Sequence, residues 1–204
     1  MTNSPEQIDT VISDVGGVIL MPSGTSLFLD WIVGESGVDR DYLAKELSIR
    51  RKAITAGQIT ENDYFQYVSD LGIPLSADEL RKVYISLLSP NAEMVTLLNE
   101  LRESGLTMAL LSNSIPCQTI AIRQALGGII DIELFSNEMG SRKPNPFTWE
   151  IALEILGKDP EQCLVTDDKA VNLIAPAELG MHVEQFVSPE DFRRILREKY
   201  HLVF

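Results

Sequence analysis

The chain has 204 residues, of which 17 are basic and 30 acidic, so its formal net charge at pH 7 is −13. This length suits one domain, or one domain with an inserted lobe, and is sufficient to bury a sizeable core. The negative charge argues against the phosphate backbone of a nucleic acid as a partner and is compatible with cation binding. Two cysteines, Cys117 and Cys163, form no metal-binding or disulfide pattern, so we expect a reduced, cytoplasmic setting.

Residues 10–29 contain a single charged side chain, Asp14, and their apolar character invites comparison with a membrane span. Pro22, three glycines and several hydroxyl-bearing residues argue against a span. The preceding polar tail carries the acidic residues Glu6 and Asp9 instead of the basic residues that open a secretory signal. We therefore expect neither a membrane segment nor a secretory signal.

The first predicted element is a buried parallel strand over residues 11–20, because its apolar residues are almost continuous and rich in Val and Ile. Asp14 lies within this run, and a buried carboxylate is costly unless something binds it. Gly16 and Gly17 follow as a turn where the backbone can approach a ligand closely. Because ligands dock at the carboxyl ends of parallel strands, Asp14 is the first candidate for chemistry. The alternative is an Asp that only accepts backbone hydrogen bonds in a turn.

A long segment without any strand pattern follows, over residues 22–90. Its apolar residues recur at helical spacing throughout. Predicted helices cover residues 26–33 and 39–56, and two more begin after the capping residues Thr60 and Ser76. A single crossover helix needs only about a dozen residues. We therefore expect a helical lobe over residues 22–90, inserted into a core formed by residues 1–21 and 91–204.

Strands and helices alternate in the remainder of the chain. Predicted strands cover residues 106–111, 133–135, 162–166 and 183–187, and predicted helices cover residues 94–101, 116–126, 147–156, 170–179 and 189–200. This alternation predicts an α/β fold, a three-layer sandwich around a parallel sheet.

Four polar clusters follow the predicted strands or lie in their loops. They are Asp14, Ser112–Asn113, Lys143 and Asp167–Asp168. Because the carboxyl ends of parallel strands lie on one edge of a sheet, we expect these clusters to converge. Each has a simpler interpretation alone: a turn, a surface lysine, or acids that cap a helix. Their combination favours a site.

The chemistry that these residues suggest is phosphoryl transfer. Asp14 is a carboxylate that can attack phosphorus and form an aspartyl phosphate. Asp167 and Asp168 repel each other, and a hard divalent cation such as Mg²⁺ would relieve that repulsion. The backbone carbonyl of Gly16 is a further candidate ligand for the metal.

A second group of candidates would hold the phosphate. The Ser112 hydroxyl and nearby backbone N–H groups, including those of Gly17 and Asn113, would bind the transferring oxygens. Lys143 would offset the negative charge that develops during the reaction. We therefore expect both catalytic and phosphate-binding roles for Ser112 and Lys143.

In these motifs the chain resembles the haloacid dehalogenase superfamily, chiefly its phosphatases. Its four motifs are matched by residues 12–18, 110–113, 142–144 and 165–168 with Asn172. The resemblance implies a Rossmann-like core, a Mg²⁺ ion and a covalent intermediate. It makes Asp14 both nucleophile and metal ligand, with the Gly16 carbonyl, Asp167 and Asp168 completing the metal site. The helical insert is similar to the small cap of this superfamily.

One position departs from the pattern of most of these phosphatases. They carry a second Asp two residues after the nucleophile as general acid and base, and this chain has Gly16 there. Loss of a general acid typically lowers rates by about 10²–10⁴-fold. We therefore expect a strong dependence on the acidity of the leaving group.

The cap is expected to select a small soluble phosphomonoester, such as a sugar phosphate, in a monomer or homodimer. Arg51 lies in the basic segment 50–52 of the insert and would meet a second anionic group, unless that segment is only a solvated helix face. Two other functions stay open. One is a metal-free 2-haloacid dehalogenase, and the other is a non-enzymatic or catalytically weak protein on the same frame.

Overall fold

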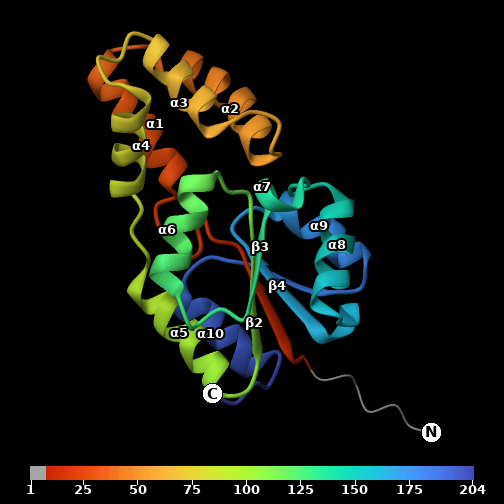
Figure 1. The fold of residues 1–204 in the computed structure, drawn as a ribbon. Helices are drawn as coiled ribbons and strands as arrows, with labels where there is room; N and C mark the ends of the chain where they lie inside the picture. The colour runs from red at the N-terminus through yellow and green to blue at the C-terminus, as the bar shows by residue number, and fades with distance from the viewer. Residues whose placement is uncertain (1–7) are drawn as a thin grey trace, which may run out of the picture.

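The computed structural model describes residues 8–204, and the polar tail expected at the N-terminus lies outside them. A five-stranded sheet with the order β3-β2-β1-β4-β5 forms the centre of the molecule (Figure 1), and every neighbouring pair is parallel. Its strands are β1 (Thr10–Ser13), β2 (Thr107–Ser112), β3 (Ile132–Phe135), β4 (Cys163–Asp167) and β5 (His182–Gln185).

Helices cover both faces of this sheet. The helices outside the insert are α5 (Ala92–Glu103), α6 (Pro116–Leu126), α7 (Ser136–Met139), α8 (Pro146–Leu156), α9 (Ala170–Glu178) and α10 (Pro189–Glu198), with a short 3₁₀ turn at Pro160–Gln162. Alternate strand residues enter different layers: Val11 packs with α5, α6 and α10, whereas Ile12 packs with α8 and α9. The predicted three-layer α/β sandwich is thus confirmed. None of the helices in residues 8–204 is long and apolar enough to cross a membrane.

Four helices form the insert above the carboxyl ends of the strands (Figure 1): α1 (Gly24–Ser36), α2 (Arg40–Thr55), α3 (Glu61–Asp70) and α4 (Ala77–Ser86). Thr60 and Ser76 form the capping boxes that begin α3 and α4, as the sequence predicts. The insert has its own apolar cluster, which extends into the core segment through Ile115 and Cys117. A division into two domains with boundaries near residues 22 and 90 stays a prediction.

The first strand ends at Ser13, so the strand predicted over residues 11–20 is too long, although Asp14 follows its carboxyl end and a turn follows at Gly16 and Gly17, as the sequence predicts. Pairing ends at Ser13, and the N–H groups of Ile19 and Leu20 both donate to the Val15 carbonyl, at 2.9 and 2.7 Å. Gly17 adopts a φ of 96°, which turns the chain out of the sheet. Residues 18–20 are apolar because the turn that contains them is buried, and they do not continue the strand.

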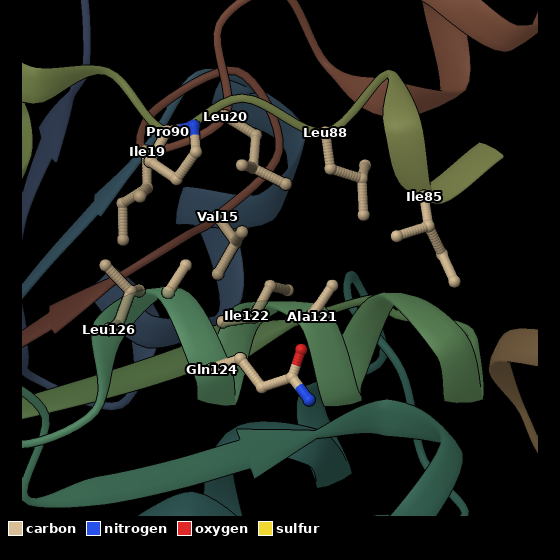
Figure 2. Close-up of a pocket in the computed structure, with 11 residues that line it drawn as sticks. Val15, Ile19, Leu20, Ile85, Leu88, Pro90, Ala121, Ile122, Gln124 and Leu126 are labelled. Carbon is tan, nitrogen blue, oxygen red and sulfur yellow. The ribbon is translucent and has the colours of Figure 1, made fainter. Parts of the chain in front are cut away.

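A small apolar cavity lies beside this buried turn. It has a volume of about 310 Å³, and Val15, Ile19 and Leu20 line it together with Ile122 and Leu126 of α6 (Figure 2). The periodicity of buried turns and buried strands is the same over a few residues, so sequence alone did not separate them.

We predict that Phe65→Ala destabilises the protein by about 3–5 kcal/mol, because truncating a fully buried aromatic leaves a cavity. Phe65 makes edge-on contacts with Phe28, Tyr64 and Tyr84, at centroid distances of 6.0, 5.2 and 6.0 Å. Urea unfolding followed by circular dichroism measures the effect. Ile49→Ala, at an exposed position of α2, is the control and should change the free energy of unfolding little. A loss below about 1 kcal/mol for Phe65→Ala would contradict the prediction.

Candidate active site

Asp14 is the first residue beyond the end of β1. Its N–H donates to the Thr166 carbonyl of β4 at 2.9 Å, which fixes the backbone between two strands. The side chain is buried and reaches a cavity of about 520 Å³ between the sheet edge and the insert. Of the predicted site residues, this cavity is lined by Asp14, Gly16, Arg51, Ser112, Asn113 and Lys143.

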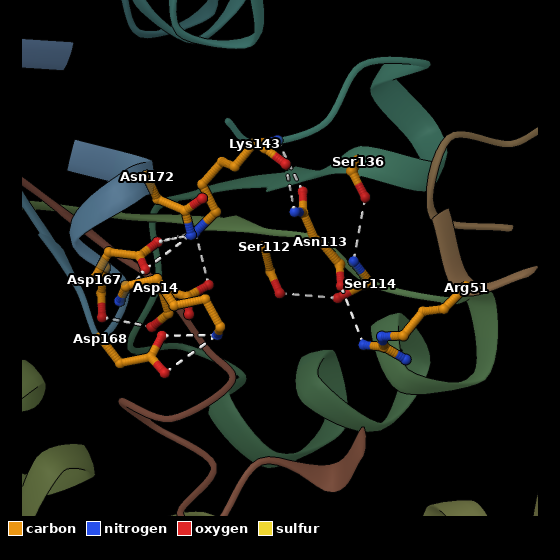
Figure 3. A network of polar contacts seen from close by, with 12 residues as sticks. Asp14, Arg51, Ser112, Asn113, Ser114, Ser136, Lys143, Asp167, Asp168 and Asn172 are labelled. Carbon is orange, nitrogen blue, oxygen red and sulfur yellow. Dashed lines mark hydrogen bonds and ion pairs between the residues drawn. The ribbon is translucent and has the colours of Figure 1, made fainter. Parts of the chain in front are cut away.

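Lys143 lies between two carboxylates at the bottom of this cavity (Figure 3). Its Nζ donates to Asp14 Oδ1 at 2.7 Å and to Asp167 Oδ2 at 2.6 Å, and all three side chains are buried. Burial raises the pKa of Asp14, while the Lys143 ammonium opposes that shift. Burial alone would lower the pKa of Lys143, but the two carboxylates outweigh it, so the net shift is upward. The contact therefore favours the charged form of the lysine.

Asn113 positions the loop that carries Lys143. Its Oδ1 accepts the Lys143 N–H at 3.0 Å, and its Nδ2 donates to the Lys143 carbonyl at 2.9 Å. Next to it, Ser112 is buried at the end of β2, and its hydroxyl oxygen accepts a hydrogen bond from Ser114 at 3.0 Å. The second predicted motif thus both lines the cavity and holds the third.

The two acids at the end of β4 have different environments. Asp167 is fully buried, and its two oxygens receive four hydrogen bonds, from Lys143 Nζ, the Lys169 N–H and, twice, Asn172 Nδ2. Asp168 is partly exposed, and its side chain contacts Lys169 Nζ at 3.0 and 3.2 Å. Asp167 therefore has its acceptor positions filled by the protein, whereas Asp168 has acceptor positions left.

Gly17 is required where it stands. A Cβ at this position would lie 2.5 Å from Asp168 Oδ2, and its φ of 96° also disfavours other residues. Gly16 is different, since a Cβ there would make only an ordinary 3.7 Å contact with Ser23. The backbone at Gly17 thus passes directly beside the carboxylate of Asp168.

The residues present fit a divalent cation. Asp14, Asp167 and Asp168 each offer an oxygen, and these atoms lie within 4.8 Å of one another. Three carboxylates with the ammonium groups of Lys143 and the exposed Lys169 leave a net charge of −1 when all are ionised. Hard oxygen donors in such a cluster suit Mg²⁺.

Arg51 from the insert and Arg142 from the loop before α8 both line the cavity. Arg51, on α2, donates to Tyr84 Oη at 3.3 Å and to the Asn113 carbonyl and Gln118 Oε1, both at 3.4 Å. Arg142 Nε donates to Thr55 Oγ1 at 3.1 Å. The sequence had singled out Arg51 but gave no role to Arg142, Gln118 or Asn172. Asn172 carried a signal, because it lies on the first turn of the helix that follows the two acids.

A model of the haloacid dehalogenase-like hydrolases matches residues 8–180. The chain belongs to this family. The resemblance drawn from the four motifs is thereby confirmed, and so is the prediction of a hydrolase. The match spans the strands that carry Asp14, Ser112 and Asp167.

Two curated phosphatases are distant relatives of this hydrolase. A bifunctional riboflavin kinase/FMN phosphatase of Arabidopsis thaliana is 25% identical over 179 residues, which are 81% of this chain and 47% of that protein. A phosphatase of Mycobacterium tuberculosis (strain CDC 1551 / Oshkosh) is 26% identical over 173 residues, 76% of this chain and 80% of that protein. The chain thus spans about half the length of the plant relative.

Solved structures of the family share the fold. A Bacteroides thetaiotaomicron enzyme in complex with magnesium and inorganic phosphate has a TM-score of 0.76 at 21% identity, covering 93% of this chain and 100% of that one. The L-2-haloacid dehalogenase of Xanthobacter autotrophicus has a TM-score of 0.66 at 19% identity, covering 93% and 82%. Because phosphatases and dehalogenases both occur on this fold, the choice between them depends on the site.

We predict that Lys143→Met, measured with a chelator present, destabilises this hydrolase by about 3–5 kcal/mol, because two carboxylates would remain buried without a cation. Lys169→Met is the matched control, since it removes an exposed ion pair with Asp168 and should change stability by less than about 1 kcal/mol. Urea unfolding of both variants gives the comparison. Equal effects for the two would show that burial of the Lys143 pair is not what matters.

Proposed function

We propose that this hydrolase is a Mg²⁺-dependent phosphatase that cleaves a small soluble phosphomonoester, such as a sugar phosphate, through an aspartyl phosphate. The observation that carries the proposal is the convergence of Asp14, Lys143, Asp167 and Asp168 at one edge of the sheet. A cavity of about 520 Å³ opens above Asp14, which is room for a small substrate.

In this mechanism an oxygen of Asp14 attacks the phosphorus atom, and the bond to the leaving oxygen breaks. The leaving group departs as an alkoxide that takes its proton from solvent water, because Gly16 provides no general acid, and a second water then hydrolyses the aspartyl phosphate to restore Asp14 and release phosphate. Lys143 donates to Asp14 Oδ1 at 2.7 Å and so orients this carboxylate, and its ammonium opposes the upward shift that burial causes in the pKa of Asp14.

The Ser112 hydroxyl and the backbone N–H group of Asn113 bind the phosphoryl oxygens. The Gly17 N–H, which the sequence also proposed for this role, instead donates to the Leu20 carbonyl at 2.8 Å.

Asp14, the Gly16 carbonyl and Asp168 would hold the metal, and Asp167 would orient this set. The reason is the hydrogen bonding of the two carboxylates: that of Asp167 already accepts four hydrogen bonds, whereas that of Asp168 accepts only from the exposed Lys169 Nζ among residues 8–204. When bound, Mg²⁺ supplies positive charge that offsets the repulsion between a carboxylate nucleophile and a phosphate.

We predict that the protein releases phosphate from at least one member of a panel of phosphorylated metabolites with Mg²⁺ and from none with a chelator. Asp14→Asn should reduce release to background, because the amide is not a nucleophile toward phosphorus. A colorimetric phosphate assay measures both. Halide release from 2-haloacids without Mg²⁺ would instead support the dehalogenase alternative. Mg²⁺ binding without turnover of any phosphomonoester would support the non-enzymatic one.

We further predict that kcat/KM falls steeply as the pKa of the leaving group rises, because Gly16 provides no general acid. Gly16→Asp should restore one and raise the rate for the poorest leaving groups by about 10²-fold or more. A Cβ at this position meets only Ser23, at an ordinary distance of 3.7 Å. A series of aryl phosphates gives the slope, and Gly16→Asn, which has the same shape without an acid, is the matched control. A flat series in the unmodified protein would contradict the prediction.

The cytoplasmic setting and the state of monomer or homodimer stay predictions from the sequence. The first is supported by two free cysteines, Cys117 and Cys163, which are both buried and unpaired with each other. Burial raises the pKa of both thiols. Neither cysteine belongs to the proposed chemistry.

A further inference from the structure

Two arginines line the cavity above Asp14 without an acidic partner. Arg51 comes from α2 of the insert, and Arg142 comes from the loop that precedes α8. Neither forms a salt bridge with any residue in the described range 8–204, although six other arginines do. The chain has 30 acidic residues, yet neither guanidinium group contacts a carboxylate of the described residues. Such a pair indicates a binding site for an anion.

The two arginines are held by neutral groups that cross between the insert and the core. Arg51 donates to the Asn113 carbonyl and Gln118 of the core, and Arg142 donates to Thr55 of the insert. Thr55 Oγ1 in turn donates to the Arg51 carbonyl at 2.7 Å. These contacts position both guanidinium groups and leave their positive charge uncompensated.

Several donors of this pair remain free. The contacts of Arg51 measure 3.3–3.4 Å, near the upper limit for hydrogen bonds. Among residues 8–204, Arg142 donates only through Nε, so both of its terminal nitrogens are available. Burial lowers the pKa of Arg142, and the Arg51 guanidinium lowers it further, as expected of two nearby like charges. An oxyanion placed between them would relieve this repulsion and accept the free N–H groups.

We propose that Arg51 and Arg142 form a second anion-binding subsite, so that the preferred substrates are phosphomonoesters with a further oxyanion, a carboxylate or a second phosphate. The subsite rests on the proposed phosphatase function, because it receives the part of the substrate that is not cleaved. Lys52 also lines the cavity and adds to its positive charge. A single phosphoryl group held at Asp14 leaves the arginine side of the cavity for the remainder of the substrate.

The competing interpretation is that the arginines only attach the insert to the core. The two interpretations differ in one measurable respect. An attachment acts on every substrate equally, whereas a subsite acts only on substrates that carry the second anion. The comparison must therefore be made between substrates of the same length with and without that group.

The first experiment uses the full chain with Mg²⁺ and three phosphate esters of propyl chains: one plain, one ending in a carboxylate and one ending in a second phosphate. We expect at least one doubly anionic ester to exceed the plain ester in kcat/KM by about tenfold or more, the range of a charge-assisted hydrogen bond. Arg142→Gln should abolish that preference, lowering kcat/KM for the doubly anionic ester to about the value for the plain ester. The ester that shows the preference distinguishes carboxylate from phosphate.

Arg51→Gln should act in the same direction, and Arg142→Lys should keep part of the preference because it keeps the charge. Lys45→Gln is the matched control: it removes one positive charge from the exposed face of α2, away from the cavity, and should leave the preference intact. Equal losses for all three esters in Arg142→Gln, or no preference in the unmodified protein, would overturn the subsite.

A binding measurement separates this proposal from the phosphatase itself. Calorimetry compares 4-phosphonobutanoate with butylphosphonate, two probes that cannot be hydrolysed at the P–C bond. We expect the carboxylated probe to bind about tenfold more tightly to the unmodified protein, and equally to Arg142→Gln. That result without turnover of any ester would uphold the subsite and overturn the phosphatase. Equal affinities in the unmodified protein would overturn a carboxylate subsite, and 1,4-butanediphosphonate tests the phosphate form in the same way.

Discussion

The contact on which the site depends is the ammonium of Lys143 between the carboxylates of Asp14 and Asp167. A buried ion is costly by several kcal/mol unless it is paired and hydrogen-bonded, so none of the three groups is stable in its place alone. The contact also demands a particular topology. β1 and β4 must be neighbours to bring the two carboxylates together, and the loop after α7 must cross the same sheet edge to deliver the lysine. The contact between these three side chains therefore requires this order of the strands.

Next to this contact, the two acids at the end of β4 differ in how many of their carboxylate oxygens the protein already binds. Asp167 is enclosed by donors, while Asp168 stands beside Gly17, where no side chain would fit. The arrangement leaves both carboxylate oxygens of Asp167 occupied by donors of the protein and those of Asp168 in contact with Lys169 alone among the described residues. Burial and hydrogen bonding make this difference, since the two side chains are chemically identical. A divalent cation is the partner that such an environment suits.

The insert participates in the site through both apolar and polar contacts. Its apolar cluster takes in Ile115 and Cys117, and the backbone N–H of Cys117 donates to Glu61 at 2.6 Å, so α6 begins in contact with the insert. Tyr84 donates to Gln118 at 3.0 Å within this boundary. The cavity thus has one wall from the sheet edge and another from the helices, and its positive side faces the insert.

The sequence by itself determined the features that depend on neighbours along the chain. The alternation of strands and helices, the capping boxes at Thr60 and Ser76, and the acids placed just after β4 all follow from local patterns. The end of β1 did not, because a buried turn and a buried strand show the same apolar run. The pairing of Arg51 with Arg142 was also beyond the sequence, since these residues are far apart and meet only across the cavity. Local chemistry encodes burial and helix ends, whereas the direction of the chain and the contacts between distant side chains arise only when the layers pack.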